Sequence, residues 1–240
     1  TLPQLIRPDL FDPHTVHWHG FPNAAPIFDG EPMASLSINP GHSFTFFYNV
    51  VEPGTFMYHC HVEATEHMQM GMLGNLYVEP RQNQAGSRPG CAGVGTKFAY
   101  NDTDCGTEFH VDFALQMAGF DPLFHDANEN IQPLPFATMK DTYMMLNGRG
   151  YPDTINANSL SNTYAGHDSG GKVVQLLSAR ITATQGQKIL LRLSNLSTVH
   201  FTTLTSLGIP MKVVGKDARI LRGGGVPAGT DLSYTTNSVI

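Results

Sequence analysis

Charge is scarce in this sequence, and long apolar runs are missing. Only 14 % of the 240 residues are Asp, Glu, Lys or Arg, and the formal net charge is −6, whereas about 25 % is usual for globular proteins. An acidic chain of this kind is not expected to bind nucleic acid, which attracts basic surfaces. No run approaches the roughly 20 apolar residues of a membrane-spanning helix, so no membrane span is predicted.

Glycine and proline, in contrast, are frequent. The 24 Gly and 16 Pro residues divide the chain with turns, and the short runs between them are rich in aromatic and β-branched residues, which favour strands. The expected strands are residues 43–51, 54–61, 74–78, 109–113, 143–147, 172–177, 188–193 and 199–204. The sequence therefore predicts an all-β protein.

Histidines gather around one of the three cysteines. Successive side chains of a strand alternate between its two faces, so His59 and His61 share one face and Cys60 points to the other. Upstream, His17 and His19 also share a face. Two metal-binding faces are therefore predicted back to back.

The face of Cys60 offers one thiolate, two imidazoles and one thioether. His14 can join this face because it lies an odd number of positions before His17. Such a ligand set is typical of a blue, type 1 copper site, which exchanges one electron with little rearrangement. The predicted type 1 ligands are His14, Cys60, His67 and Met72.

The opposite face offers only imidazoles, which also suit copper. Because two of them flank Cys60 in the chain, an electron would have a short bonded route, about 10 Å across the strand, between the two sites. The predicted ligands of this second cluster are His17, His19, His59 and His61.

Both motifs resemble those of the multicopper oxidases, the family of laccases, ceruloplasmin and bilirubin oxidase, and more distantly those of the copper nitrite reductases. Residues 14–20 (HTVHWHG) resemble the family's H-x2-H-x-H motif, and residues 54–72 (GTFMYHCHVEATEHMQMGM) resemble its H-C-H…H-x4-M motif. The resemblance implies type 1 copper on the first face and half of a trinuclear, type 2 and type 3 copper cluster on the second. It also implies two partners: O2, and a one-electron reductant such as a phenol, Mn(II), Fe(II) or Cu(I).

In this family the trinuclear cluster takes eight histidines in four H-x-H pairs, and this chain contains two pairs. The other four histidines are expected from a missing segment, another domain or a neighbouring subunit. The remaining histidines stand alone and are not expected to bind copper: His42, His110, His125, His167 and His200.

Asp29 lies in an Asp-Gly turn, ten residues after His19. It resembles the family acid that delivers protons during O2 reduction, a reaction that consumes four protons and needs a positioned acid. The alternative interpretation of Asp29 is an ordinary turn residue.

Two other functions stay open. A copper nitrite reductase would carry Asp and a non-ligand at the positions of His17 and His61. A pure electron-transfer cupredoxin would use only the type 1 ligands and leave the second cluster without a role.

The type 1 ligand loop departs from the family in length, because six residues separate Cys60 from His67 where many laccases have four. The loop contains Glu63 and Glu66. These acids could hold a reducing cation or accept a phenolic proton, and an ordinary solvated loop is the alternative.

With Cys60 assigned to copper, Cys91 and Cys105 remain for a disulfide, which would place the protein outside the reducing cytoplasm. Two free thiols are the alternative.

The resemblance implies tandem cupredoxin-like Greek-key β-sandwich domains. They are residues 1–80 with copper ligands and residues 108–240 without, joined by a Gly-rich connection at 81–107. Both ends look truncated. The chain is therefore expected to be part of a longer extracytoplasmic polypeptide, which is periplasmic, cell-surface or secreted.

Overall fold

The computed structural model describes residues 12–21, 25–91, 93, 95–161, 173–175, 177–223 and 229–240. His167, together with Lys172 and Leu176 of one expected strand, lies outside these residues. Strands dominate the described part and helices are few, so the expected all-β class is confirmed. None of the helices in the described part has the length and apolarity that a bilayer crossing requires.

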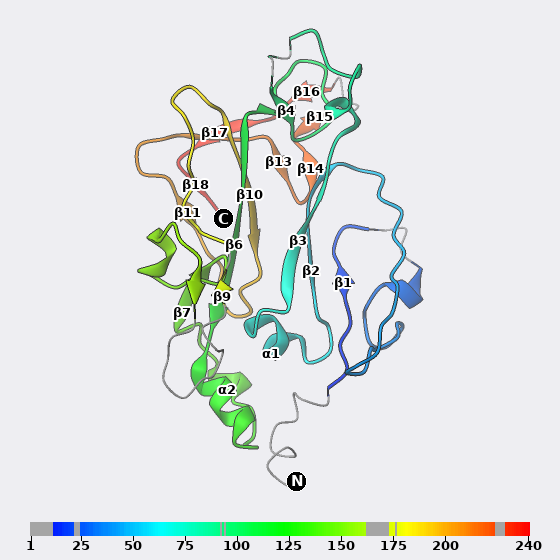
Figure 1. Cartoon of the computed structure of the whole chain (residues 1–240), viewed down its shortest axis with the longest axis vertical. Coiled ribbons are helices and arrows are strands. Elements are labelled where there is room, and N and C mark those ends of the chain that lie inside the picture. The colour runs from blue at the N-terminus through cyan, green and yellow to red at the C-terminus, as the bar shows by residue number, and fades with distance from the viewer. Residues whose placement is uncertain are drawn as a thin grey trace.

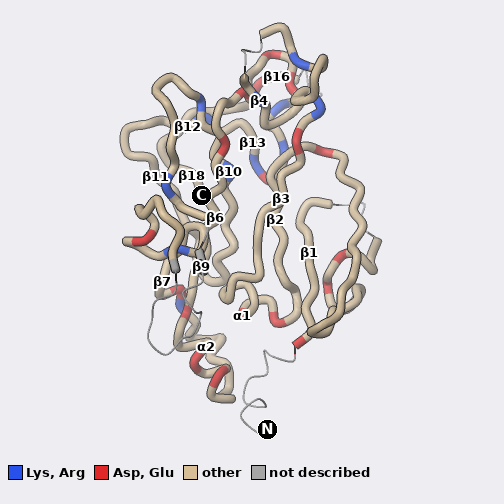
Figure 2. The backbone as a smooth tube through the Cα atoms, viewed as in Figure 1, with Lys and Arg blue, Asp and Glu red and all other residues tan. Residues whose placement is uncertain are grey.

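The first sheet carries the histidine motifs. It is antiparallel, in the order β1 (His17–Trp18), β2 (Gly54–His59) and β3 (Leu73–Val78). Its register pairs His17 with His59, which brings the two H-x-H motifs side by side. These three strands contain no charged residue, and Figure 2 shows charge gathered elsewhere along the chain.

The strand expected at residues 43–51 is absent, so that prediction was wrong. The side chains do alternate, because Phe44, Phe46 and Tyr48 are half-buried while Phe47 is 68 % exposed. The rings of Phe46 and Tyr48 stack 6.3 Å apart. Within the described residues the segment has no strand partner, so it keeps the alternation of a strand without its hydrogen-bond ladder.

The second sheet is built on β6 (Val111–Phe120), which lies between β10 (Ile189–Asn195) and β7 (Tyr143–Leu146). β10 runs parallel to β6 and β7 runs antiparallel to it. These three strands overlap the runs predicted near residues 109–113, 143–147 and 188–193. The run 199–204 was a wrong prediction, since only its last residue enters a strand.

The remaining strands form short antiparallel pairs. They are β4 (Lys97–Phe98) with β5 (Glu108–Phe109), β8 (Leu160–Ser161) with β9 (Val173–Gln175), β11 (Leu204–Thr205) with β18 (Ser238–Val239), β12 (Met211–Val213) with β17 (Tyr234–Thr236), β13 (Gly215–Lys216) with β14 (Arg219–Ile220), and β15 (Arg222–Gly223) with β16 (Thr230–Asp231).

In the described part of the chain, two α-helices and four 3-10 turns interrupt the strands. They are α1 (Ala64–Gln69), α2 (Pro122–Glu129), η3 (Pro26–Phe28), η4 (Arg81–Asn83), η5 (Phe136–Thr138) and η6 (Asp153–Ile155). α2 begins where it does because the Asp121 carboxylate accepts the backbone N–H of Leu123 at 3.0 Å and Pro122 follows as the first helical residue. In Figure 1, α1 lies between the first sheet and the strand β6 with its helix α2.

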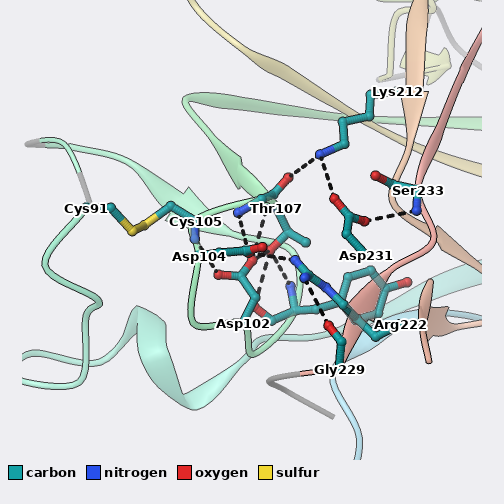
Figure 3. A network of polar contacts seen from close by, with 12 residues as sticks. Cys91, Asp102, Asp104, Cys105, Thr107, Lys212, Arg222, Gly229, Asp231 and Ser233 are labelled. Atoms are coloured by element: carbon teal, nitrogen blue, oxygen red, sulfur yellow. Dashed lines mark hydrogen bonds and ion pairs between the residues drawn. A yellow bond between two sulfur atoms is a disulfide. The ribbon is translucent and has the colours of Figure 1, made fainter. Parts of the chain in front are cut away.

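The segment 81–107 is packed against the C-terminal hairpins rather than running free as a connection. The expected disulfide between Cys91 and Cys105 is present. Figure 3 shows the neighbouring Asp102 accepting backbone N–H groups from Cys105 and Thr107, at 3.0 and 2.9 Å. Asp104 pairs with Arg222 of β15 at 2.6 Å. The boundaries of the two expected domains remain a prediction.

One buried cation ties the two sheets together. Arg192 of β10 is 6 % exposed; its Nε donates to Asp112 at 3.2 Å and its NH1 group donates to the hydroxyl of Thr55 in β2 at 3.1 Å. Its guanidinium also lies 4.8 Å from the centre of the Tyr77 ring in β3. The histidine-bearing sheet is therefore fixed against the second sheet by charge, hydrogen bonds and a cation-π contact.

Candidate metal centre

The thiol of Cys60 lies between two imidazoles, just beyond the end of β2. Its Sγ is 3.3 Å from Nδ1 of His67 and 3.8 Å from Nδ1 of His14. His14 is held by a two-way backbone bridge to Ile38, at 2.9 and 2.8 Å. Cys60 and His67 are buried, at 2 % and 3 % exposure. One sulfur and two imidazole nitrogens thus converge, with Cys60 and His67 buried, and they are the donor types of a type 1 copper ligand set.

The backbone of Met72 closes the loop around this site. Its N–H donates to the carbonyl of His67 at 2.9 Å, and its own carbonyl accepts the N–H of Cys60 at 3.0 Å. Met72 is therefore anchored directly to two of the other predicted ligands. Its thioether as the fourth ligand remains a prediction.

The long ligand loop folds into α1, an element that strand periodicity did not predict. Glu63 stays exposed before the helix, and its carboxylate, that of Asp12 and an imidazole nitrogen of His67 lie within 4.8 Å of one another. Glu66 instead points inward at 3 % exposure and contacts Asn128 of α2. Only the first of the two glutamates thus lies where it could meet an approaching reductant, and Asp12 joins it there unforeseen.

The second cluster lies on the opposite face of β2. The ring of His17 is 4.9 Å from that of His19, 5.4 Å from that of His59 and 5.0 Å from that of His61. The Nε2 atoms of His19 and His59 approach to 3.0 Å. Ligand nitrogens of His17, His19 and His59 lie within 4.8 Å of one another, and the ring of His61 packs beside that of His17.

Hydrogen bonds fix which ring nitrogen His17 and His59 leave free to bind a metal. Nδ1 of His17 donates to the carbonyl of Asp29 at 2.7 Å, and Nδ1 of His59 donates to the carbonyl of Cys60 at 2.8 Å. Nε2 of both rings is thereby left with a lone pair, the usual arrangement of metal-bound histidine. The hydroxyl of Thr15, 2 % exposed, accepts the backbone N–H of His61 at 3.1 Å. Strand periodicity gave no signal for Thr15.

Burial favours the neutral form of His19 and His59. It lowers the pKa of His19, and repulsion from the neighbouring imidazoles lowers that pKa further. Burial also lowers the pKa of His59, against the upward effect of its backbone hydrogen bond. Neutral imidazole is the form that binds metal, so these two rings are held in the form that a cation would bind.

A cavity of about 670 Å³ opens beside this cluster. Its lining includes His17, His19 and Asp29, and also residues 217–219, which form the turn after β13 and the first residue of β14. The Asp29 carboxylate lies 3.6 Å from Nδ1 of His17 and is 39 % exposed. An acid therefore stands at the edge of the imidazole cluster and in contact with solvent.

Tyr48 supports that edge. Its hydroxyl donates to the carbonyl of Phe28 at 2.5 Å, one residue before Asp29. Burial, helped by the negative charge of Asp29, raises the pKa of Tyr48 to about 12, so the hydroxyl stays a donor. The alternating aromatic residues of 43–51 indicate that the Tyr48 side chain points inward, although the same pattern predicts a strand that is absent.

The solitary histidines join neither cluster within the described part of the chain. His42 is exposed and bonds to the carbonyl of Pro40, and His125 is buried against Gln69. His110 accepts the N–H of Lys188, and His200 lies 3.5 Å from Asp141. That these four do not bind copper remains a prediction.

Comparisons with known proteins find sequence similarity over the part of the chain that carries the histidine motifs. The multicopper oxidase family profile matches residues 8–83. L-ascorbate oxidase of Cucurbita pepo var. melopepo is 38 % identical over 71 residues, which is 29 % of this chain and 12 % of that protein. A copper-containing nitrite reductase of Neisseria meningitidis serogroup A is 34 % identical over 77 residues, 32 % of this chain and 19 % of that protein. The matches thus cover the histidine motifs and a small part of each relative.

The fold likeness extends much further. A blue copper oxidase from Nitrosomonas europaea superposes with a TM-score of 0.62 at 22 % identity, over 95 % of this chain and 55 % of that one. The expected cupredoxin-like fold and the resemblance to multicopper oxidases are both confirmed.

Proposed function

We propose that this chain, which resembles the multicopper oxidases in sequence over residues 8–83 and in fold over 95 % of its length, belongs to an oxidase that couples a one-electron reductant to O2. The observation that carries this proposal is that two ligand sets meet on the consecutive residues His59, Cys60 and His61, at the end of β2. Cys60 contacts His14 and His67 on one side, and its neighbours His59 and His61 join the cluster on the other. No side-chain nucleophile is needed for such chemistry.

Each set fits copper. His14, Cys60 and His67 would hold type 1 copper with Met72, and the second set would hold half of a trinuclear, type 2 and type 3 cluster. When bound, copper would supply one-electron transfer at the first site and multi-electron reduction of O2 at the second. The chain's own residues orient the imidazoles, exclude water from Cys60 and hold an acid at the edge of the cluster. The four further histidines would come from another part of the polypeptide or from a neighbouring subunit.

The reductant is proposed as a phenol or a metal cation such as Mn(II), Fe(II) or Cu(I). The carboxylates of Asp12 and Glu63 beside His67 support either substrate class, because they attract a metal cation and can accept the proton that a phenol releases when it is oxidised. The disulfide supports an extracytoplasmic location.

A copper nitrite reductase is the second candidate, favoured by the relative in Neisseria meningitidis. Against it stand the imidazoles of His17 and His61, whose rings lie 5.0 Å apart. A mononuclear site would need a carboxylate and a non-ligand at these two positions. An electron-transfer cupredoxin would leave the whole second cluster unused.

Copper content of the full-length protein tests the proposal. We expect about four coppers per functional unit, with blue and normal signals in the paramagnetic-resonance spectrum, as the family resemblance implies. One blue copper alone would mean an electron carrier. One blue and one normal copper with nitrite turnover would favour the second candidate.

Asp29→Asn is expected to slow O2 consumption about 100-fold while copper content stays the same, since a positioned acid typically contributes at least that factor. The bond to His17 uses the carbonyl of residue 29 and therefore survives the change. Oxygen uptake under saturating reductant measures the effect, with Asp126→Asn on the exposed face of α2 as the control. An unchanged rate would return Asp29 to the role of a turn residue.

A further inference from the structure

Gln69, a buried residue of α1, links the predicted type 1 site to the second part of the chain. It is 5 % exposed and lies two residues after His67. Its amide makes four hydrogen bonds, which use both acceptor and both donor positions of that group. Oε1 accepts from the N–H of Asp121 and Nε2 of His125, both at 3.0 Å, and Nε2 donates to Asp141 at 3.3 Å and Thr198 at 3.2 Å.

The surroundings of Gln69 are built to receive it. The side chain of Asp141 has no exposed surface, and it reaches Gln69 by lying directly over Gly119 of β6. A Cβ at position 119 would meet the Asp141 carboxyl carbon at 2.0 Å. A glycine in the interior of a strand often marks such a close approach. The missing side chain at Gly119 therefore makes room for the Asp141 carboxylate, which accepts a hydrogen bond from Gln69.

A second contact holds the same face of α1. Glu66 lies three residues before Gln69, a spacing that places both side chains on one side of a helix. Glu66 is 3 % exposed and contacts the amide of Asn128 in α2. Asp121, whose backbone N–H donates to Oε1 of Gln69, is also the residue that caps α2. α1 is therefore attached to both ends of α2.

We propose that Gln69 is a positioning residue, which directs Nδ1 of His67 toward Cys60 by fixing α1 against β6 and α2; this inference rests on the proposed copper function. α1 has six residues, and so short a helix does not define its own orientation in water. Its direction is set by tertiary contacts, of which the Gln69 amide supplies four. The 3.3 Å approach of His67 to Cys60 depends on that direction.

The test compares copper-loaded, full-length wild type with Gln69→Leu, which keeps the volume of the side chain and removes its hydrogen bonds. Residues that orient a metal ligand typically change metal affinity by about 10- to 100-fold. We therefore expect at least about tenfold weaker retention of type 1 copper against a chelator. A shifted visible maximum and an altered copper hyperfine splitting should accompany it.

Gln82→Leu is the matched control. Gln82 is also buried, at 6 % exposure, and also bonds through its amide, to Asp102 at 2.8 and 3.4 Å. It lies beyond the end of β3 that is remote from His67. This variant should lose thermal stability and keep the wild-type spectrum, which separates positioning from a general effect of a lost buried amide.

Thr198→Val keeps the test decisive where Gln69→Leu fails to fold, since it removes one partner of Gln69 without changing size. It should move the spectrum in the same direction by a smaller amount. The positioning role would be overturned if Gln69→Leu kept the wild-type spectra and copper retention. If Gln69→Leu does not fold, the same result in Thr198→Val would overturn it. A wild type that never turns blue would overturn the proposed function, and this inference with it.

Discussion

Cys60→Ser is expected to abolish the blue colour of the copper-loaded protein and to remove the type 1 copper, while the chain still folds. The colour of such a site comes from the bond between copper and thiolate. A serine hydroxyl is not deprotonated near neutral pH and cannot replace that ligand. The site would keep the imidazoles of His14 and His67, whose Nδ1 atoms lie 3.8 and 3.3 Å from the lost sulfur. Turnover with any one-electron reductant should fall to background.

Visible absorption, copper content and thermal unfolding together measure this result. The chain supplies a matched control in its other two cysteines, which form a disulfide within the segment 81–107 and belong to neither ligand set. Cys91→Ser with Cys105→Ser should lower the free energy of unfolding by about 2–4 kcal/mol and leave the blue band in place. A Cys60→Ser protein that stays blue would show that the type 1 assignment is wrong.

The two ligand faces could be predicted because they depend on local geometry. Alternation along a strand separates Cys60 from His59 and His61 by itself, and the pairing of His17 with His59 only adds a neighbour to a face already defined. Cys91 and Cys105 followed by elimination once Cys60 had a role. In each case the residues that decide the outcome are close together in the sequence.

The support around the site could not be predicted, because it depends on residues distant in the chain. Gln69 donates to Thr198, which lies 129 positions further along the chain. Where a loop was expected, α1 packs against α2 through Glu66 and Gln69. The run 43–51 has the alternation of a strand, yet a ladder needs a partner that no local pattern reveals. Thr15 and Tyr48 act through single hydroxyl groups, which leave no periodic signal.

Replacing His17 should have the opposite effect from replacing Cys60. In the His17→Ala protein the type 1 ligands are untouched, so we expect the blue band to remain and to bleach when reductant is added. O2 consumption should stop, because His17 is the ring nearest the middle of its cluster, with three other imidazoles centred 4.9 to 5.4 Å away. The change also removes the hydrogen bond to the carbonyl of Asp29 and so loosens the turn that carries the acid.

His42→Ala is the matched control, since His42 is exposed and its imidazole ring bonds to the nearby Pro40 carbonyl. It should match wild type in colour, copper content and O2 uptake. Bleaching by reductant under anaerobic conditions, followed by admission of air, separates the two halves of the reaction. Wild type and His42→Ala should regain their colour in air, and His17→Ala should stay bleached because electrons have no outlet. Recovery of colour in the His17 variant at the wild-type rate would remove His17 from the O2-reducing cluster and leave this sheet with a single working copper site.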